Sequence, residues 1–212
     1  SFEVSAHYLI SKTGEVVQMV AEEYRAWHAG AGEWRGQDDI NSRSIGIELD
    51  NTGAEPFPEP QMGALEQLLR DIRNRWQIDP LNIIGHSDMA PGRKKDPGPR
   101  FDWRRLALGG LACWPLASAA GEGASAPEPA APAAAEPGEA AFLRSLASHG
   151  YPAGIGGDVL LAAFRSRFRP WARGPLAATD IALAADLARR TLHGEISRGE
   201  LLHSPDAVRQ YL

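Results

Sequence analysis

An alternating stretch, Ser44-Ile45-Gly46-Ile47-Glu48-Leu49-Asp50, predicts a β-strand in the first half of the chain. Side chains of a strand point to opposite faces in turn, so the three large aliphatic residues face a core and Glu48 faces the open side. Gly46 shares the face of Glu48 and leaves room there for a ligand or for another segment of backbone. An outward carboxylate on a half-exposed strand is also commonplace. The strand alone therefore leaves Glu48 between a catalytic residue and a solvated one.

A second informative segment runs from Gly85 to Pro99 with the sequence GHSDMAPGRKKDPGP, directly after the apolar pair Ile83-Ile84. It places an imidazole (His86), an ammonium (Lys94) and a carboxylate (Asp96) on one loop stiffened by Pro and Gly. Zinc accepts imidazole nitrogen and carboxylate oxygen, and a catalytic zinc needs three protein ligands and an open position for water. The loop offers two of them. This spacing is not a standard metal signature, so a polar turn with a solvated Lys remains the alternative.

The first part of the chain predicts an α/β fold with a mixed central sheet flanked by helices. Apolar residues recur at helical spacing between residues 60 and 77, where Leu65, Leu69 and Ile72 share a face. Alternating or continuous apolar runs predict the strands, which we expect near residues 4–10, 15–20, 44–50 and 81–85.

A change of composition divides the chain into two units. Residues 117–138 contain only Ala, Ser, Gly, Pro and Glu, which cannot build a core. The segment is therefore predicted to be a linker between residues 1–116 and residues 139–212. Its Pro and Glu residues are typical of an extended, solvated, semi-rigid spacer.

The second unit predicts a small three-helix domain. A first apolar stripe ends at Gly150, a second follows Asp158 as a cap, and a third follows Thr179 as a cap. Leu and Phe stripes of this kind first of all form a core of their own. The stripes are Phe142, Leu143, Leu146; then Leu160, Leu161, Phe164, Phe168; then Ile181, Ala185, Ala188, Leu192.

Composition excludes several classes of protein. The chain has 212 residues, 43% of them hydrophobic, which is enough to bury a core of ordinary domain size. A formal charge of −5 without a basic stripe argues against a nucleic-acid partner. No apolar run approaches about 18 residues, so no transmembrane segment is expected. Cys113 is the only cysteine and permits no internal disulfide.

Four segments together resemble the type-2 family of zinc-dependent N-acetylmuramoyl-L-alanine amidases. Besides the two already described, they are Val4-Ser5-Ala6-His7-Tyr8-Leu9-Ile10 and Arg25-Ala26-Trp27-His28-Ala29-Gly30. The resemblance runs in order from Phe2 to about Pro115, and it includes residues 41–48 and Phe101-Asp102-Trp103.

The resemblance implies a zinc ion (Zn²⁺) as cofactor and a role for four residues. His86 and Asp96 match zinc ligands, Glu48 matches the general acid/base, and Lys94 matches the residue that stabilises the transition-state oxyanion. The chemistry is coherent, because zinc activates water near neutral pH and a carboxylate can carry its proton to the departing amine.

The same resemblance places Trp27 and His28 along the substrate groove. The family's first zinc ligand is a His upstream of the segment that matches Val4 to Ile10. We therefore expect that ligand to lie in an N-terminal piece absent from this chain. His7 is expected to be a packed, hydrogen-bonded residue rather than a ligand, whereas His28 is open between a groove residue and a structural one.

The implied activity is hydrolysis of the amide bond between N-acetylmuramic acid and L-alanine in peptidoglycan or muropeptides. The helical unit more loosely resembles the peptidoglycan-binding domain of periplasmic, outer-membrane-linked members. We therefore expect a periplasmic enzyme, with outer-membrane anchoring through the absent N-terminus, whose helical unit folds separately and tethers it to the wall.

Two other functions remain open at this point. A non-catalytic peptidoglycan-recognition module would share the groove and lack the metal. The joint presence of Glu48, Lys94, His86 and Asp96 favours the enzyme, since a binder needs no such set. A cytosolic amidase that recycles muropeptides is disfavoured by the linker and the second domain.

Overall fold

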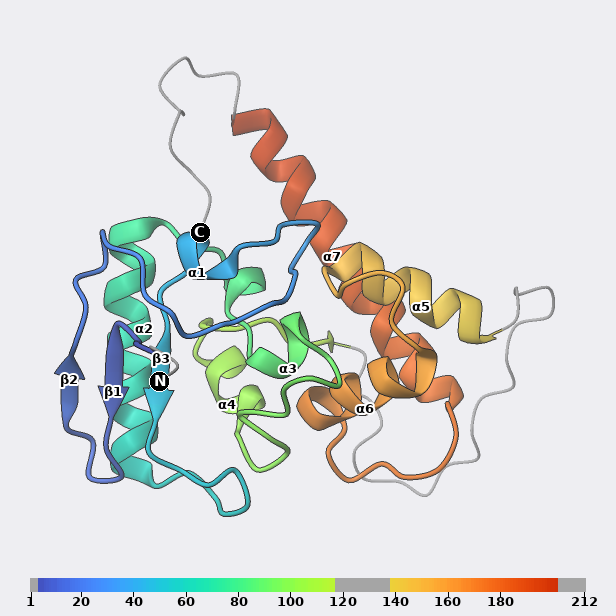
Figure 1. Cartoon of the computed structure of the whole chain (residues 1–212). Helices are drawn as coiled ribbons and strands as arrows, with labels where there is room; N and C mark the ends of the chain where they lie inside the picture. The colour runs from blue at the N-terminus through green and yellow to red at the C-terminus, as the bar shows by residue number, and fades with distance from the viewer. Residues whose placement is uncertain (1–3, 117–137, 202–212) are drawn as a thin grey trace.

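A small mixed sheet forms the centre of the first unit. The computed structural model describes residues 4–116 and 138–201, with side chains as far as Leu192. Strand β1 (Tyr8–Ile10) lies in the middle, antiparallel to β2 (Val16–Gln18) and parallel to β3 (Ile47–Leu49), in the order β2-β1-β3 (Figure 1). The predicted α/β fold with a mixed sheet is confirmed, although each strand is shorter than its predicted range.

Helix α2 (Glu59–Trp76) covers one face of this sheet, close to the predicted range of 60–77. Met62, Leu65 and Leu69 are buried against Ile10, and the partly buried Ile47 and Leu49 join this cluster from β3. The side-chain amide of Gln61 donates to the carbonyl oxygen of Ile10 at 2.9 Å. The apolar face of β3 is thus held down, which leaves Glu48 directed to the other side.

The predicted strand at residues 81–85 is wrong. Pro80–Asn82 forms a 3₁₀ turn (η1), and the Asp79 carboxylate caps it by accepting from the amide of Leu81 at 2.8 Å. A proline at the start of the turn has no N–H to lose, and Asp before it satisfies a free amide, so the local sequence favours a turn. The extended pair Ile83-Ile84 then leads into the short helices α3 (His86–Met89) and α4 (Trp103–Leu108).

The three predicted helices of the second unit are confirmed as α5 (Gly138–His149), α6 (Gly157–Phe168) and α7 (Ala178–Leu201). Gly150 follows α5 with a φ of 138°, which suits glycine and ends the helix there. Asp158 and Thr179 lie inside the first turns of their helices rather than before them. The predicted linker, as far as residue 137, lies outside the described residues.

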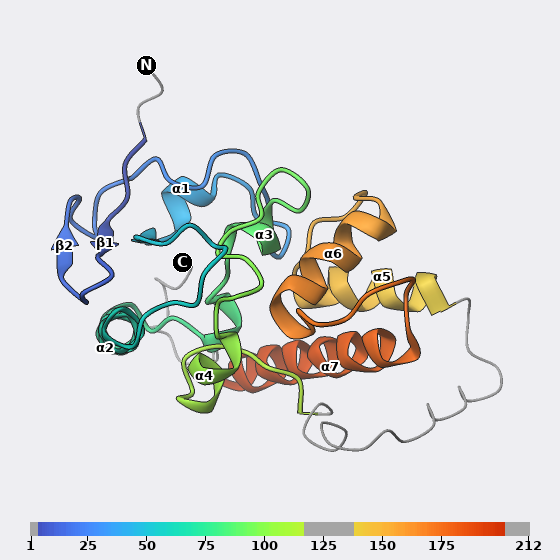
Figure 2. The same ribbon diagram turned by 90° about the horizontal axis from the view of Figure 1, so that it is seen from below.

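The sequence led us to expect a separately folded helical unit that tethers the enzyme to the wall. In the structure, the helical unit instead packs directly against the sheet unit. Trp34, Met89 and Cys113 of the first unit belong to one buried cluster with Phe164 and Phe168 of the second. Helices α3 and α4 both contact α6, as Figure 2 shows from below. The apolar stripes of the helices therefore face the first unit as well as one another.

An aromatic group marks this junction. The Trp34 ring meets the rings of His149 and Tyr151 edge-on, with centroids 5.6 and 5.5 Å apart. The amide of Arg35 donates to the carbonyl of Gly150 at 2.8 Å, which fixes the end of α5 against the first unit.

His149 is the titratable member of the group and is only 1% exposed. Its Nδ1 bonds to the Thr191 hydroxyl at 2.8 Å, and that hydroxyl donates to the carbonyl of Leu187, so Nδ1 carries the hydrogen. Burial, with the charge of Arg167 adding to it, lowers the pKa of His149 to about 3.

We predict that His149 makes the protein lose stability on mild acidification. Below pH 6.5 the unfolded chain takes up a proton that the folded His149 refuses until about pH 3, so the free energy of unfolding falls through that window. In His149→Gln the fall between pH 7 and pH 5 should be smaller by about 2 kcal/mol. Urea unfolding of both proteins at the two pH values measures it, and an unchanged pH dependence would show that His149 is not responsible.

Candidate active site

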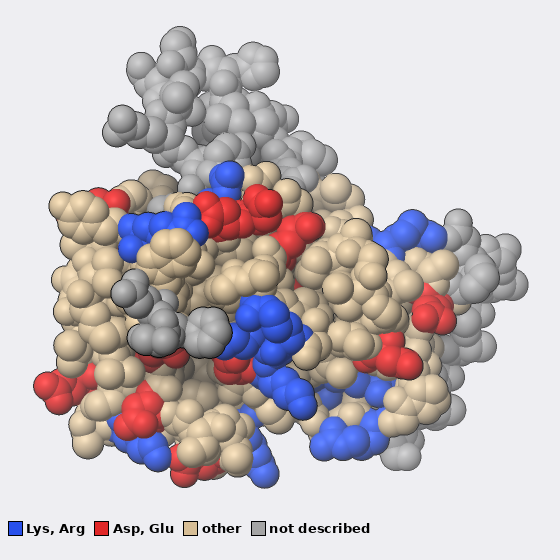
Figure 3. Space-filling model, viewed as in Figure 1, with Lys and Arg blue, Asp and Glu red and all other residues tan. Residues whose placement is uncertain are grey.

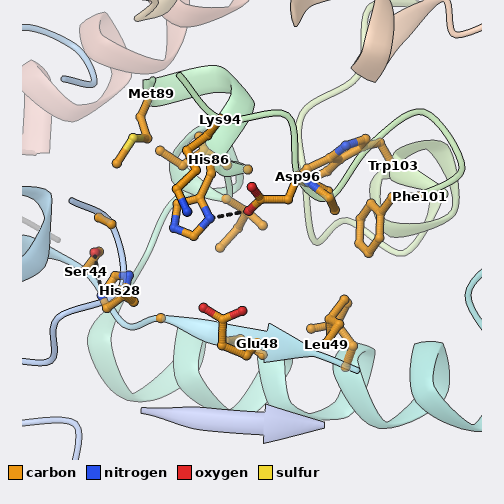
Figure 4. A pocket seen from close by; sticks show the side chains of 18 of the residues that line it. His28, Ser44, Glu48, Leu49, His86, Met89, Lys94, Asp96, Phe101 and Trp103 are labelled. Carbon is orange, nitrogen blue, oxygen red and sulfur yellow. Dashed lines mark hydrogen bonds and ion pairs between the residues drawn. The ribbon is translucent and has the colours of Figure 1, made fainter. Parts of the chain in front are cut away.

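A cavity of about 1180 Å³ lies between β3 and the loop of residues 85–99. Of the predicted site residues, all except Trp27 line this cavity: His28, Glu48, His86, Lys94 and Asp96. Figure 4 shows them around one space, with Glu48 rising from β3 toward the loop that carries the other charged groups. Figure 3, viewed as in Figure 1, shows Lys and Arg side chains gathered near the centre of that face of the molecule.

His86 and Asp96 are in direct contact through Nδ1 and Oδ2. Their backbone holds them together, because the amide of Ser87 donates to the carbonyl of Asp96 at 3.0 Å. Gly85 permits the close approach, since a Cβ there would lie 2.6 Å from Cδ of Pro97. Partial burial raises the pKa of Asp96, but the hydrogen bond and charge of His86 outweigh it and leave this pKa below its ordinary value. The carboxylate is therefore ionised at neutral pH.

Glu48 occupies the centre of β3, directly opposite Leu9 in the parallel ladder with β1. It is exposed, whereas its neighbours Ile47 and Leu49 are partly buried on the other face. The predicted alternation thus aims this carboxylate at the paired His86 and Asp96 across the cavity (Figure 4).

His28 reaches the cavity from a loop that Asn41 holds in place. The side-chain oxygen of Asn41 accepts from the amides of His28 and Ala29 at 2.9 and 2.8 Å. The His28 ring lies 6.4 Å, centroid to centroid, from that of His86. Burial, with the charges of His7 and His86 adding to it, lowers the pKa of His28 to about 4. The imidazole is therefore neutral at pH 7 and offers a hydrogen bond without a charge.

Gly46 is what makes room for that imidazole. A Cβ at Gly46 would lie 2.4 Å from Cγ of His28, closer than any side chain tolerates. We predicted that Gly46 leaves room on the face of the strand that carries Glu48. In the structure, the His28 ring fills that room. Arg93 fixes the same loop from the opposite side, because its guanidinium donates to the carbonyl of Ala29 at 2.7 Å.

His7 is confirmed as a structural residue. It is 1% exposed; Nδ1 accepts from the amide of Gly46 at 2.9 Å, and Nε2 donates to the carbonyl of Tyr24 at 3.0 Å. Both ring nitrogens are occupied, so neither is free for a metal.

Trp27 does not line the cavity. Its side chain is 53% exposed, and the guanidinium of Arg25 stacks over it at 4.1 Å while pairing with Asp39 at 2.8 Å. The structure places it on the surface beside the His28 loop, and its contact with substrate stays a prediction.

Other lining residues were not singled out from the sequence. Arg35, Arg43 and Lys95 add positive charge to the lining. Arg43 and Lys95 lie inside the segments 41–48 and 85–99 and could have been found there, whereas Arg35 lies outside both. Asn41 supports the His28 loop from outside the cavity lining; it lies inside the matching range 41–48 and could have been found there.

The donor atoms that line the cavity are of the types that bind zinc. Among the described residues no group of three or more His, Cys, Asp or Glu side chains is placed to hold a metal. His86 and Asp96 nevertheless bring one imidazole nitrogen and one ionised carboxylate to the same point, which is the donor chemistry of zinc enzymes.

Comparison with known proteins is informative for both units. Residues 1–99 match the family model described as N-acetylmuramoyl-L-alanine amidase. The chain is 36% identical over 191 residues to the N-acetylmuramoyl-L-alanine amidase AmiD of Escherichia coli, covering 79% of this chain and 67% of that protein. It is 46% identical over 103 residues to the 1,6-anhydro-N-acetylmuramyl-L-alanine amidase AmpD of Enterobacter cloacae, covering 49% of this chain and 55% of that protein.

Solved structures agree. AmiD of E. coli in complex with anhydro-N-acetylmuramic acid-L-Ala-D-γ-Glu-L-Lys matches with a TM-score of 0.76 at 34% identity, over 90% of this chain and 81% of that one. AmpDh3 of Pseudomonas aeruginosa matches with a TM-score of 0.72 at 31% identity, over 89% and 83% respectively. Both matches extend across the sheet unit and the helical unit.

We predict that Gly46→Ala displaces the His28 ring from the cavity. The added methyl group cannot fit beside the imidazole, so the substitution should cost about 1–3 kcal/mol of stability. Gly63→Ala in α2 is the matched control, because nothing lies within 4 Å of its new Cβ and helix propensity should raise stability by about 0.5–1 kcal/mol. Chemical denaturation and the NMR shifts of the His28 ring report the two effects. A Gly46→Ala protein with both unchanged would refute the packing argument.

Proposed function

The chain belongs to the N-acetylmuramoyl-L-alanine amidase family, and on this basis we propose that it hydrolyses the amide bond between N-acetylmuramic acid and L-alanine in peptidoglycan or muropeptides. The observation that carries the proposal is the cavity in which Glu48 faces the paired His86 and Asp96, with Lys94 on the same wall. The muropeptide bound to the AmiD relative supports the same class of substrate.

His86 and Asp96 would hold the zinc ion. When bound, zinc polarises a carbonyl and lowers the pKa of water toward about 7. The ionised carboxylate of Asp96 and the imidazole of His86 would supply such an ion with one hard oxygen and one borderline nitrogen donor.

Glu48 would act as general acid and base. Its exposed carboxylate takes the proton of the attacking water and then returns it to the nitrogen of the departing L-alanine, so that the amine leaves neutral. The position of Glu48 on a strand that is hydrogen-bonded to β1 keeps the carboxylate facing the scissile bond through both transfers.

Lys94 and His28 would serve the substrate rather than the proton transfer. The Lys94 ammonium stabilises the negative charge that develops on the amide oxygen in the transition state. His28 is neutral because its pKa lies near 4, and it can orient a polar group of the muropeptide by a hydrogen bond.

We also propose that the enzyme works on the periplasmic side, linked to the outer membrane, and that its helical unit contributes to wall binding. The AmiD relative supports the part that concerns the helical unit, because its similarity to this chain extends across that unit. None of the described helices is both long enough and apolar enough to cross a bilayer. Fractionation of cells that express the full-length gene product tests the location, and recovery from the cytosol would contradict it.

Glu48→Gln should separate catalysis from metal binding. We expect turnover of a muramoyl-peptide to fall about 10²- to 10⁴-fold in the full-length gene product while zinc content stays the same, because a general acid/base contributes about that much. Asp50→Asn is the matched control: it removes the next outward carboxylate along the same segment and should leave turnover near normal. Near-normal turnover in Glu48→Gln would return Glu48 to the role of a solvated strand residue.

The metal content tests the ligand assignment. The full-length gene product should retain about one zinc per chain after dialysis, and His86→Ala should lose metal and activity together. Elemental analysis beside an activity assay on the same preparations measures both. Stoichiometric zinc in His86→Ala would place the metal elsewhere.

A further inference from the structure

A buried carboxylate joins the two units directly behind the loop of residues 85–99, which carries His86 and Asp96 and is called the metal loop below. Asp88 is 0% exposed and lies on α3, two residues after His86. Its Oδ1 accepts from the Tyr151 hydroxyl at 2.7 Å, and its Oδ2 accepts from Nη1 of Arg167 at 2.5 Å. Both partners belong to the helical unit.

The same carboxylate holds the backbone of the metal loop. Oδ2 of Asp88 also accepts from the amide of Gly85 at 2.9 Å, and the amide of Asp88 donates to the carbonyl of Gly85 at 3.0 Å. These bonds close the turn that presents His86. A helix as short as α3 has little stability of its own, so its geometry depends on such contacts.

Arg167 also supports the side of the loop that carries Asp96. Its Nη2 donates to the carbonyl of Ile83 at 3.1 Å, and its guanidinium stacks over the Trp103 ring at 4.0 Å. Cζ2 of Trp103 lies 3.2 Å from the position of a Cβ at Gly85, where Pro97 also packs. One guanidinium therefore contacts the backbone of Ile83 before the loop, the α3 carboxylate and the ring that backs the Asp96-Pro97 turn.

The network of Asp88, Arg167 and Tyr151 tolerates little change, because its charges are buried. The Arg167 and Asp88 side chains are only 2% and 1% exposed, so loss of either partner leaves a charge buried without compensation. Burial, with the charge of Asp88 adding to it, raises the pKa of Tyr151 well above its ordinary value, so the hydroxyl keeps its proton and donates. The helices have a separate buried pair, Arg165 with Asp180, for their own packing.

We propose that Arg167 and Tyr151 are positioning residues that act through Asp88 to hold His86 and Asp96 in the arrangement that binds the metal. The helical unit is then part of the framework of the catalytic centre and not only a wall anchor. The inference rests on the proposed function as far as zinc is concerned, but the packing of the loop can be measured without metal or substrate.

The test uses the full-length gene product with Arg167→Met, Arg167→Lys and Tyr151→Phe. We expect zinc, measured by chelator competition, to bind about 10- to 100-fold more weakly in Arg167→Met, which is the range for groups that orient metal ligands. Tyr151→Phe should weaken zinc binding less, and Arg167→Lys should restore part of the loss. Hydrogen exchange of the metal-free proteins should show faster exchange at the amides of Gly85, Ser87 and Asp88 in the same order.

Arg165→Met is the matched control. It breaks the buried ion pair between Arg165 on α6 and Asp180 on α7, so it should lower thermal stability. The hydrogen bonds of Arg165 go to Asp180 and to the carbonyls of Gly174 and Pro175, so zinc affinity and exchange in the metal loop should stay unchanged. An equal loss of zinc affinity in Arg165→Met would reduce the effect to global stability and overturn the proposal.

One further result would also overturn the proposal, and another would separate it from the proposed function. If Arg167→Met does not fold, the near-isosteric Tyr151→Phe decides, and unchanged exchange at the Gly85 amide in that variant refutes the role of the network. If the wild-type protein binds no zinc and cleaves no muropeptide, the proposed function fails, while exchange in the metal-free variants still shows whether the helical unit holds the loop.

Discussion

The buried carboxylate of Asp88 is the constraint around which the molecule is organised. A charge at this depth persists only if it is paired and hydrogen-bonded, and its donors come from the loop itself (Gly85) and from the helical unit (Tyr151 and Arg167). The carboxylate therefore ties the metal loop to the helices by the same bonds that keep it stable. The shared apolar cluster around Met89 and Phe164 is the hydrophobic counterpart of this junction.

The opposite wall of the cavity is built by a different chain of contacts. His7 is held between Tyr24 and Gly46, the absence of a side chain at Gly46 admits the His28 ring, and the strand continues to Glu48. One wall is thus fixed by neutral hydrogen bonds and one glycine, and the other by a buried ion pair. The cavity lies between these two hydrogen-bonded walls, an arrangement that suits the positioned acid/base catalysis proposed for it.

The sequence predicted the local features and missed the long-range ones, for physical reasons. The period-two pattern around Glu48 and the helical pattern around Leu65 are consequences of local geometry, so the exposed carboxylate and α2 could be predicted. The apolar run at Ile83-Ile84 was misjudged because Asp79 and Pro80 favour a turn over a strand. The roles of Asp88 and Arg167 carry no local signal, because they depend on a pairing across 79 residues. The composition of the linker suggested a tether and could not reveal that the helices pack on the first unit.

The most direct test of the account is the position of the metal. Crystals of the full-length gene product grown with zinc, measured above and below the zinc absorption edge, should show one anomalous peak in the cavity. We predict that it lies about 2.0–2.2 Å from a ring nitrogen of His86 and from a carboxylate oxygen of Asp96, with Glu48 facing it and not bound to it. A peak on other side chains, or one that has Glu48 as a ligand, would contradict the assignment of the site.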